Sequence, residues 1–311
     1  MSVPLKYVRY QGPVLRGMGE AAFAAFKQRA GWATPGEVIV PGPVHTVTVP
    51  PRAPELIGAY ARHVGGDPSA YRKIVPAHLF PQWTFPLTGK LVDGLKYPML
   101  AAMNGGCKLT IDQPLPAGEP LQVSGQLVSI DDNGSRAILD QKMITGTRSA
   151  PDAITAHLYV FIPLNPKDKK TGENGNGAAK GKPKDKARVP VDARELAYWK
   201  LSAEAGLDFA KLTGDFNPVH WVPAWAHAFG FKSTILHGFG TMARAFEGLV
   251  RTKFAGDVNA IREFDVRFTR PLVLPARVGL YIDGERIWVG DAPGGPAYLE
   301  GSFKTRERSY D

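Results

Sequence analysis

The sequence predicts an α+β fold in which two similar halves occur in one chain. Three observations support this prediction: a polar, basic stretch divides the chain, a weak repeat spans that stretch, and each half orders as a helix followed by several strands. This order is typical of a helix that lies across an antiparallel sheet. We therefore expect each half to form a sheet with a helix packed against it.

The dividing stretch runs from Lys167 to Arg188. It carries eight basic and three acidic side chains, which accounts for more than half of the formal net charge of +9. It contains no large apolar residue, so it cannot bury enough surface to offset the entropy cost of its own ordering. It also lacks the aromatic side chains that stack on bases in nucleic-acid-binding arms. We predict a basic flexible linker at residues 165–188 and no nucleic-acid partner.

The repeat has two parts. In the first, Tyr60–Tyr71 aligns without a gap on Phe209–His220 and shares an aromatic residue, an alanine, a basic residue and a glycine with it. In the second, Leu109–Leu115 resembles Val266–Leu272, and both are alternating strand patterns that run into a proline-containing bend. A further strand pattern follows each bend, at residues 121–130 and 277–282.

One helix is clear in the C-terminal half. In Gly238–Arg251 the apolar residues recur at helical spacing and leave a polar face on the other side. The matching N-terminal stretch, His78–Leu91, is interrupted by Pro81 and Pro86. Because proline removes a helical hydrogen bond, we expect any helix there to be short or kinked.

Composition limits the class of protein. The 311 residues include 44% hydrophobic and 10% aromatic residues, which is enough for packed cores in two domains of ordinary size. Cys107 is the only cysteine, which excludes an internal disulfide and favours a reducing compartment. The first residues lack an apolar signal-peptide region, and no apolar run is long enough to span a bilayer. These features predict a cytoplasmic protein without membrane insertion.

The run Gly214–Pro218 is first of all a turn sequence, and alone it indicates an Asx-type turn that ends a helix over residues 203–212. His220 follows closely, and a carboxylate and an imidazole on one turn can share a water molecule and supply an acid and a base. His237-Gly238 begins the amphipathic helix. Because helix N-termini expose unpaired N–H groups, the Gly238 amide is a candidate for binding a carbonyl oxygen that becomes anionic.

These residues carry a family resemblance. Residues 205–220, followed by residues 226–240, closely resemble the MaoC-like or hydratase-2 motif of R-specific enoyl-CoA hydratases and 3-hydroxyacyl thioester dehydratases. The resemblance implies two hot-dog folds in one chain, each an antiparallel sheet wrapped around a central helix. It implies a degenerate N-terminal hot-dog domain at residues 1–164 and a catalytic MaoC-like domain at residues 189–311.

The resemblance also implies roles for individual residues. Asp215 and His220 match the catalytic pair, and Asn217 matches the residue that supports the turn in the substrate site. Gly238 matches the glycine whose amide holds the thioester carbonyl. His237, beside it, is either a further ionisable group of the substrate site or a structural hydrogen-bonding group. The assignment of acid and base within the pair stays open, because two coupled groups titrate together.

The implied reaction is the reversible hydration of a 2-enoyl thioester, carried by CoA or a carrier protein, to the (R)-3-hydroxyacyl thioester. The N-terminal copy of the motif has Gly66 and Tyr71 in place of the catalytic pair, so we expect one active site per chain and room for a long or bulky acyl group. No metal and no cofactor are expected, because the sequence contains no motif that would bind one. The chain is expected to be a pseudo-dimer, and a homodimer stays open.

Two departures from the family pattern affect the site. Trp221-Val222-Pro223 stands where many relatives have Ile or Leu, Asp and Pro, and Phe246 stands where some have a serine. Thioester hydrolysis is an alternative activity, and a non-catalytic acyl-binding or partner subunit is another. No nucleotide-binding, serine-hydrolase or zincin motif is present in the sequence.

Other side chains have two interpretations each. Cys107 is more typical of a buried small hydrophobe than of a nucleophile. His63 and His78 lie in the degenerate half and are expected to be structural or surface groups. The aromatic residues of the N-terminal helix region are expected to belong to the core, with an acyl tunnel as the alternative; these are Phe80, Trp83 and Phe85. The candidates for binding a carrier phosphate are Lys232, Arg244 and Arg262.

Overall fold

The computed structural model describes residues 2–306, except 30–31, 33–35, 37–38 and 165–186. The predicted linker at 165–188 therefore lies almost wholly outside the described residues. In the described part of the chain, no helix is long and apolar enough to cross a membrane.

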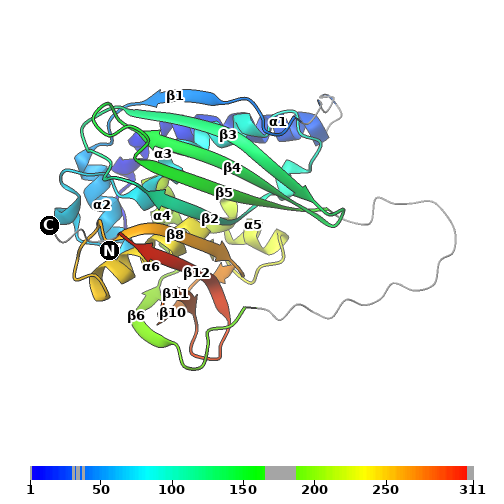
Figure 1. Cartoon of the computed structure of the whole chain (residues 1–311). Helices are drawn as coiled ribbons and strands as arrows, with labels where there is room; N and C mark the ends of the chain where they lie inside the picture. Colours follow the sequence, from blue (N-terminus) through cyan, green and yellow to red (C-terminus); the bar gives the residue numbers. More distant parts are fainter. Residues whose placement is uncertain (1, 30–31, 33–35, 37–38, 165–186, 307–311) are drawn as a thin grey trace, which may run out of the picture.

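Ten strands form one sheet that runs through both halves (Figure 1). From the outer edge to the middle, the N-terminal half contributes β1 (His45–Val49), β3 (Leu121–Asp132), β4 (Arg136–Gly146), β5 (Ile154–Pro163) and β2 (Met103–Ile111). The C-terminal half contributes, from its own outer edge to the middle, β6 (Arg194–Leu201), β10 (Ala276–Asp283), β11 (Arg286–Gly290), β12 (Ala297–Thr305) and β8 (Ile261–Phe268). The two halves thus have the same strand order, and the predicted repeat extends to the whole sheet.

The halves join where β2 pairs antiparallel with β8, with Lys108 opposite Asp265. The strands approach closely at Gly106, where a side chain would collide with the backbone carbonyl of Val266. Gly106 also has a φ of +146°, and the register of β2 on β5 shifts there. A glycine is required at this position because its backbone conformation and the close neighbour both exclude a Cβ atom.

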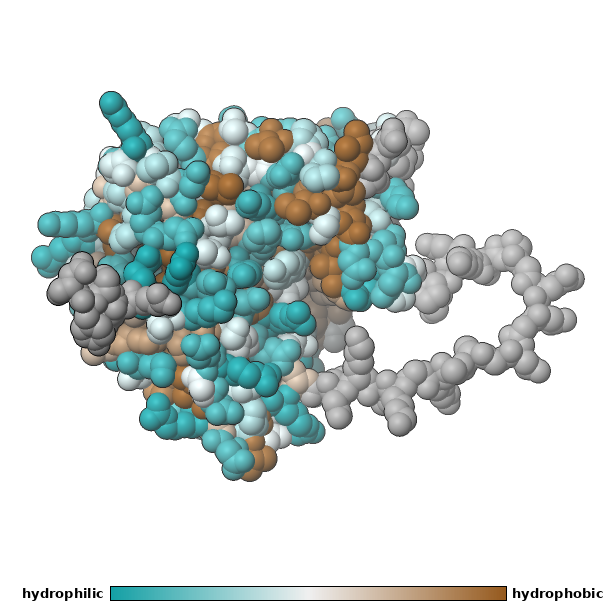
Figure 2. Space-filling view, in the orientation of Figure 1, coloured by the Kyte–Doolittle hydropathy of each residue, from teal (hydrophilic) through white to brown (hydrophobic). Residues whose placement is uncertain are grey.

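In several strands, such as β4, buried residues alternate with more exposed ones, because successive side chains point to opposite faces of a sheet. β10 and β11 differ, since they are buried over most of their length. The helices lie together on one side of the sheet (Figure 1). On the face seen in Figure 2, hydrophobic and hydrophilic side chains are interspersed. The sheet therefore buries one face against helices. Its other face is more exposed, except where Val189 and Ala193 pack with buried residues of β10, β11 and β12.

The helices repeat in the same way as the strands. α2 (Pro54–Val64) and α3 (Pro81–Leu91) of the N-terminal half correspond in chain order to α4 (Ala205–Thr213) and α6 (Gly238–Thr252). α6 confirms the predicted amphipathic helix. α3 is shorter: it begins at a proline, and Pro86 lies inside it. Two-stranded pairing of β7 (Ile235–Leu236) with β9 (Leu272–Val273), and the short helix α5 (Pro223–Ala228), occur only in the C-terminal half of the described chain.

Short 3-10 helices connect these elements. They are η1 (Leu5–Tyr10), η2 (Pro68–Tyr71), η3 (Ala77–Leu79), η4 (Met99–Ala101) and η6 (Pro218–His220). The cores of the two halves are continuous, since buried side chains from α3, α6 and both central strands contact one another. Phe80 and Trp83 are fully buried there, as expected for core residues, and so is Cys107.

The N-terminal helix α1 (Gly12–Arg29) was not anticipated. Among its contacts, Gly17 lies against Pro86 of α3, and Val14 lies against Gly214 at the end of α4. Gln11, fully buried just before α1, donates a hydrogen bond to the carbonyl of Lys211 at 3.3 Å. The start of the chain is therefore fastened to the C-terminal half.

Candidate active site

The site is built on the turn that follows α4. Gly214 ends this helix with a left-handed φ of +84°, and its amide donates to the carbonyl of Ala210 at 2.8 Å. Glycine adopts this conformation without steric cost, and it leaves room for Val14. The chain then reverses, so that Asp215 faces the beginning of α6.

Two short hydrogen-bonded links hold the turn. A carboxylate oxygen of Asp215 accepts from the amide of Asn217 at 3.3 Å, and the Asn217 side chain accepts from the amide of Val219 at 3.3 Å. The second link caps η6, which ends at His220. Asn217 is exposed and acts on the turn; a contact of its side chain with substrate stays a prediction.

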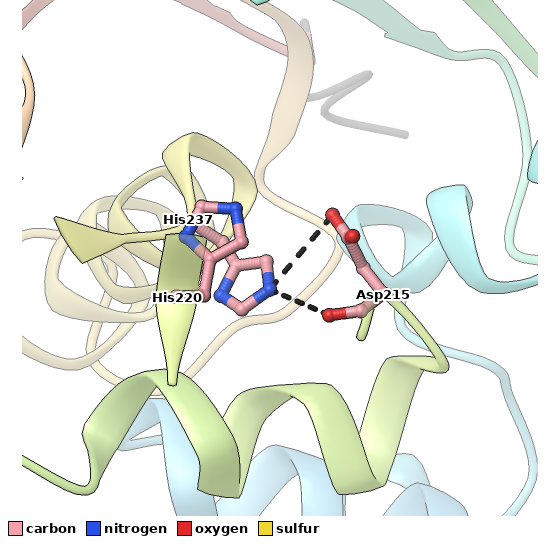
Figure 3. Close-up of side chains that lie close together, drawn as sticks. All are labelled: Asp215, His220 and His237. Carbon is pink, nitrogen blue, oxygen red and sulfur yellow. Dashed lines mark hydrogen bonds and ion pairs between the residues drawn. The ribbon is translucent and has the colours of Figure 1, made fainter. Parts of the chain in front are cut away.

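The structure brings Asp215, His220 and His237 together (Figure 3). One polar atom of each lies within 4.8 Å of the others, and the two imidazole rings stack with their centroids 3.5 Å apart. Asp215 and His237 are buried, whereas His220 is partly exposed. The cluster therefore has one side open toward solvent at His220.

Backbone carbonyls fix both histidine tautomers. His220 Nδ1 lies 2.8 Å from the carbonyl oxygen of Ile235, so Nδ1 carries the proton and Nε2 keeps a free lone pair. His237 Nε2 lies 2.8 Å from the carbonyl oxygen of Asp215 and donates to it. The same nitrogen lies 3.8 Å from the Asp215 carboxylate (Figure 3). His237 thus holds the backbone of Asp215 in place, and its ring lies beside the carboxylate.

These three side chains are also the one group within the described residues whose spacing would suit a metal ion. The fit is poor, because the His237 nitrogen nearest Asp215 is occupied by its proton and its bond to the carbonyl. The other nitrogen, Nδ1, is buried with no partner in the described chain. The donor set is better suited to hydrogen-bonding a water molecule than to ligating a metal.

Burial sets the charge states of the cluster. It raises the pKa of Asp215, against the opposing effect of His220, and it lowers the pKa of His220, against the opposing effect of Asp215. Burial, followed by the nearby His220, holds the pKa of His237 well below its usual range. Both imidazoles are therefore neutral in the folded protein near pH 7, consistent with the tautomers that the carbonyls select.

These shifts predict that stability falls as the pH is lowered below about 6.5. The unfolded chain takes up protons on His63, His220 and His237 there, whereas the folded protein does not, and each of these three contributes up to about 1.4 kcal/mol per pH unit. His63 shows the effect outside the catalytic cluster, since burial and then Arg244 lower its pKa to about 3. Asp215 acts in the opposite sense, because the folded protein protonates it at a higher pH than the unfolded chain does.

Urea unfolding from pH 8 to pH 5 measures this dependence. His63→Gln keeps an acceptor for the Arg244 guanidinium, which donates to His63 Nε2 at 3.4 Å, and we expect it to reduce the slope by about one proton. An unchanged slope in this variant would contradict the assignment of a neutral His63.

Gly238 is the first residue of α6, directly after the histidine that holds Asp215. Among the described residues, its amide has no hydrogen-bond acceptor, as is common for the first N–H groups of a helix. A Cβ atom at this position would lie 2.5 Å from the ring of Phe268. The glycine thus allows the Phe268 ring to lie against the helix mouth, and the amide remains free to bind a carbonyl oxygen.

The basic candidates do not converge with these groups. Arg244 points to His63, Arg262 pairs with Asp112 at 3.3 Å, and Lys232 is exposed with its backbone carbonyl accepting from His227. A role for them in binding a carrier phosphate stays a prediction.

The sequence does not reveal the groups that support the site from other parts of the chain. Ile235 contributes only a backbone carbonyl, and Val14 only its contact with Gly214, so neither produces a recognisable motif. Phe268 lies at the end of an alternating strand pattern, and this pattern indicates no role at the site.

Part of the chain is similar to known proteins in sequence. Residues 177–290 match the model of the MaoC like domain. The chain is 28% identical over 251 residues to 3-hydroxyacyl-thioester dehydratase X of Mycobacterium tuberculosis, which covers 79% of this chain and 83% of that protein. It is 24% identical over 195 residues to probable enoyl-CoA hydratase 2 of Dictyostelium discoideum, covering 62% and 64% of the two chains.

Solved structures show the fold. The crystal structure of HtdX from Mycobacterium tuberculosis superposes with a TM-score of 0.64 at 22% identity and covers 84% of this chain and all of that one. Another Mycobacterium tuberculosis protein, described as having a double hot-dog fold, superposes with a TM-score of 0.55 at 13% identity over 86% and 96% of the two chains. Residues 177–290 are thus similar to the MaoC like domain, and the chain has the double hot-dog fold.

Proposed function

We propose that the chain catalyses the reversible hydration of a 2-enoyl thioester to the (R)-3-hydroxyacyl thioester. The observation that carries this proposal is the convergence of Asp215 and the free Nε2 of His220 beside the unpaired amide of Gly238. The relatives named as dehydratase and hydratase support the same reaction class. The acyl carrier is CoA or a carrier protein.

The reaction follows from the charges. The Gly238 amide and the N-terminal dipole of α6 bind the thioester carbonyl oxygen and stabilise the negative charge that develops there. Electrons are thereby drawn from the C2=C3 bond. A water molecule held between Asp215 and His220 gives one proton to this pair, its oxygen bonds to C3, and the pair returns a proton to C2. The reverse sequence eliminates water.

The acid–base pair and the free carbonyl-binding amide occur in one half only, which supports one active site per chain. The N-terminal half has Gly66 and Tyr71 at the positions of the catalytic pair. The amide of Leu79, which precedes α3, donates to the carbonyl of Pro76 at 3.0 Å and is not free. This half therefore lacks both the acid–base pair and the carbonyl-binding group. We infer that residues 189–311 act as the catalytic domain and residues 1–164 as its degenerate partner.

Thioester hydrolysis is the main alternative, and a two-signal assay separates the two reactions. Purified protein is mixed with crotonyl-CoA and with longer 2-enoyl-CoA substrates, and both enoyl absorbance and free thiol are followed. Hydration removes enoyl absorbance without releasing thiol, whereas hydrolysis releases thiol. If neither signal changes for any substrate, including the carrier-protein thioesters, the chain is an acyl-binding or partner subunit and the proposal fails.

A further inference from the structure

The degenerate half contains a second buried cluster of ionisable side chains. Tyr71 ends η2 as His220 ends η6, and His78 lies shortly before α3 as His237 lies before α6. Both side chains are buried, at 3% and 1% exposure. An acid–imidazole site of the same kind would need a carboxylate at residue 66, where the chain has glycine.

That carboxylate comes from elsewhere. Glu247, on the third turn of α6 and 1% exposed, extends from the C-terminal half into the space beside Gly66. A Cβ atom at residue 66 would lie 2.5 Å from the Glu247 carboxyl carbon and no more than 2.7 Å from either oxygen. The backbone of Gly66 is not left-handed, so its conformation does not require glycine. The space that a side chain at residue 66 would take is filled by the carboxylate of Glu247.

The Glu247 carboxylate is held by Tyr71 and His78, which match His220 and His237 in chain order. Tyr71 donates its hydroxyl to Glu247 Oε1 at 2.6 Å, and His78 Nε2 lies 2.9 Å from the same oxygen. The hydroxyl of Tyr60 lies 3.0 Å from His78 Nδ1 and completes the chain of contacts. Burial and the charge of Glu247 raise the pKa of both tyrosines well above the usual range, so the phenols keep their protons and act as donors.

This cluster is closed to substrate. A small hollow next to it is lined by Tyr71 and Phe246 but by neither His78 nor Glu247. The second carboxylate oxygen of Glu247 is buried without a partner in the described chain. The amide of Leu79, which follows His78 as Gly238 follows His237, is already hydrogen-bonded to Pro76. The cluster therefore cannot perform the reaction proposed for the other half.

Its position on α6 points to a different role. α6 begins at Gly238, whose amide is proposed to bind the thioester. Glu247 bonds the middle of this helix to Tyr71 and His78 of the N-terminal half, and Arg244, one turn earlier, donates to His63. Near the end of the helix, Arg251 donates to the carbonyl of Gly65 at 3.2 Å. A helix of this length is stiff, so bonds at Glu247 restrict where its first turn can lie.

We propose that Glu247 replaces, from the C-terminal half, the carboxylate missing at residue 66, and that this relocated acid–imidazole cluster is a positioning device for α6 and its Gly238 amide. The positioning part rests on the proposed hydratase function. The relocation part does not, because it concerns packing and can be tested through stability alone.

A double-mutant cycle tests both parts in the full chain, with Gly66→Asp, Glu247→Ala and the two combined. Gly66→Asp alone places a second carboxylate against Glu247 and is expected to lower the Tm by about 5–10 °C. Glu247→Ala alone leaves Tyr71 and His78 without their acceptor and is expected to have a similar effect. In the double variant, the new carboxylate at residue 66 takes the vacated space, and the Tm should recover to above that of either single variant.

Activity is measured in the same proteins at about 20 °C, below their unfolding transitions. We expect Glu247→Ala to lower kcat for 2-enoyl-CoA hydration by about tenfold with little change in KM, and the double variant to regain most of it. If Glu247→Ala does not fold, Tyr71→Phe, which removes one of the bonds to Glu247, is expected to lower kcat about threefold.

The outcomes separate the claims. A Tm in the double variant no higher than in the single variants overturns the relocation. A lowered Tm with an unchanged kcat overturns the positioning role and leaves a purely structural cluster. If the wild-type protein turns over no enoyl thioester, the proposed function fails, while the Tm cycle still decides the relocation.

Discussion

Asp215→Asn is expected to lower kcat for enoyl thioester hydration by about 10³-fold, and His220→Ala by a similar factor. Asparagine keeps the size and hydrogen-bonding shape of the side chain but cannot take a proton from water. Alanine at residue 220 removes the free Nε2 that faces the cluster. Initial rates with crotonyl-CoA and a longer enoyl-CoA, measured in both directions, check the expectation.

In Asp215→Asn the Tm is not expected to fall together with kcat. Because burial raises the pKa of Asp215, its charged form is unfavourable in the folded protein, and Asp215→Asn should have a Tm equal to or higher than that of the wild type. His227→Ala is the matched control for His220→Ala, since His227 is exposed on the neighbouring helix α5. Activity within about threefold of wild type in both catalytic variants would disprove the assignment of the pair.

Gly238→Ala is expected to lower kcat/KM by about 10²-fold or more. The added Cβ atom would meet the Phe268 ring at 2.5 Å, so the first turn of α6 or the ring must move, and the amide no longer points at the carbonyl oxygen. Alanine has the higher helix propensity, so loss of the helix itself is not expected. Steady-state kinetics and the Tm of the same preparation distinguish displacement from unfolding.

A second variant shows whether displacement is the cause. Combining Gly238→Ala with Phe268→Ala removes the ring that collides with the new methyl group and should restore part of the lost kcat/KM. Phe268→Ala alone gives the baseline for this comparison. If the double variant is no more active than Gly238→Ala, the loss of kcat/KM does not arise from the contact between the new methyl group and the Phe268 ring. This result would contradict displacement as the cause.

The elements that could be predicted from the sequence have local patterns. The amphipathic spacing of residues 238–251 predicted α6, and alternation predicted the strands that became β3 and β10. The family motif named the C-terminal turn as the catalytic one, and Pro81 and Pro86 explained the shorter α3. Each of these signals depends on residues that are neighbours in the chain.

Other features needed the tertiary structure. The sequence allows either an ionisable or a structural role for His237. Only the position of the Asp215 carbonyl, 2.8 Å from its Nε2, shows which group it holds. His78 was expected to be structural or at the surface, but nothing in its own segment indicated Glu247 as its partner. The packing site of α1 could not be predicted either. Val14 of this helix contacts Gly214, which lies about 200 residues further along the chain.

The sequence by itself thus determined that the chain repeats an α+β unit. It also determined that the C-terminal copy keeps a carboxylate, an imidazole and a helix N-terminus that begins with glycine. The tertiary structure decided how the copies join and which groups surround each cluster. The physical reason is the range of the interactions. Helical and strand periods and turn residues act over a few positions, whereas the bonds from Tyr71 and His78 to Glu247 join residues 176 and 169 positions apart, and no local pattern encodes such contacts.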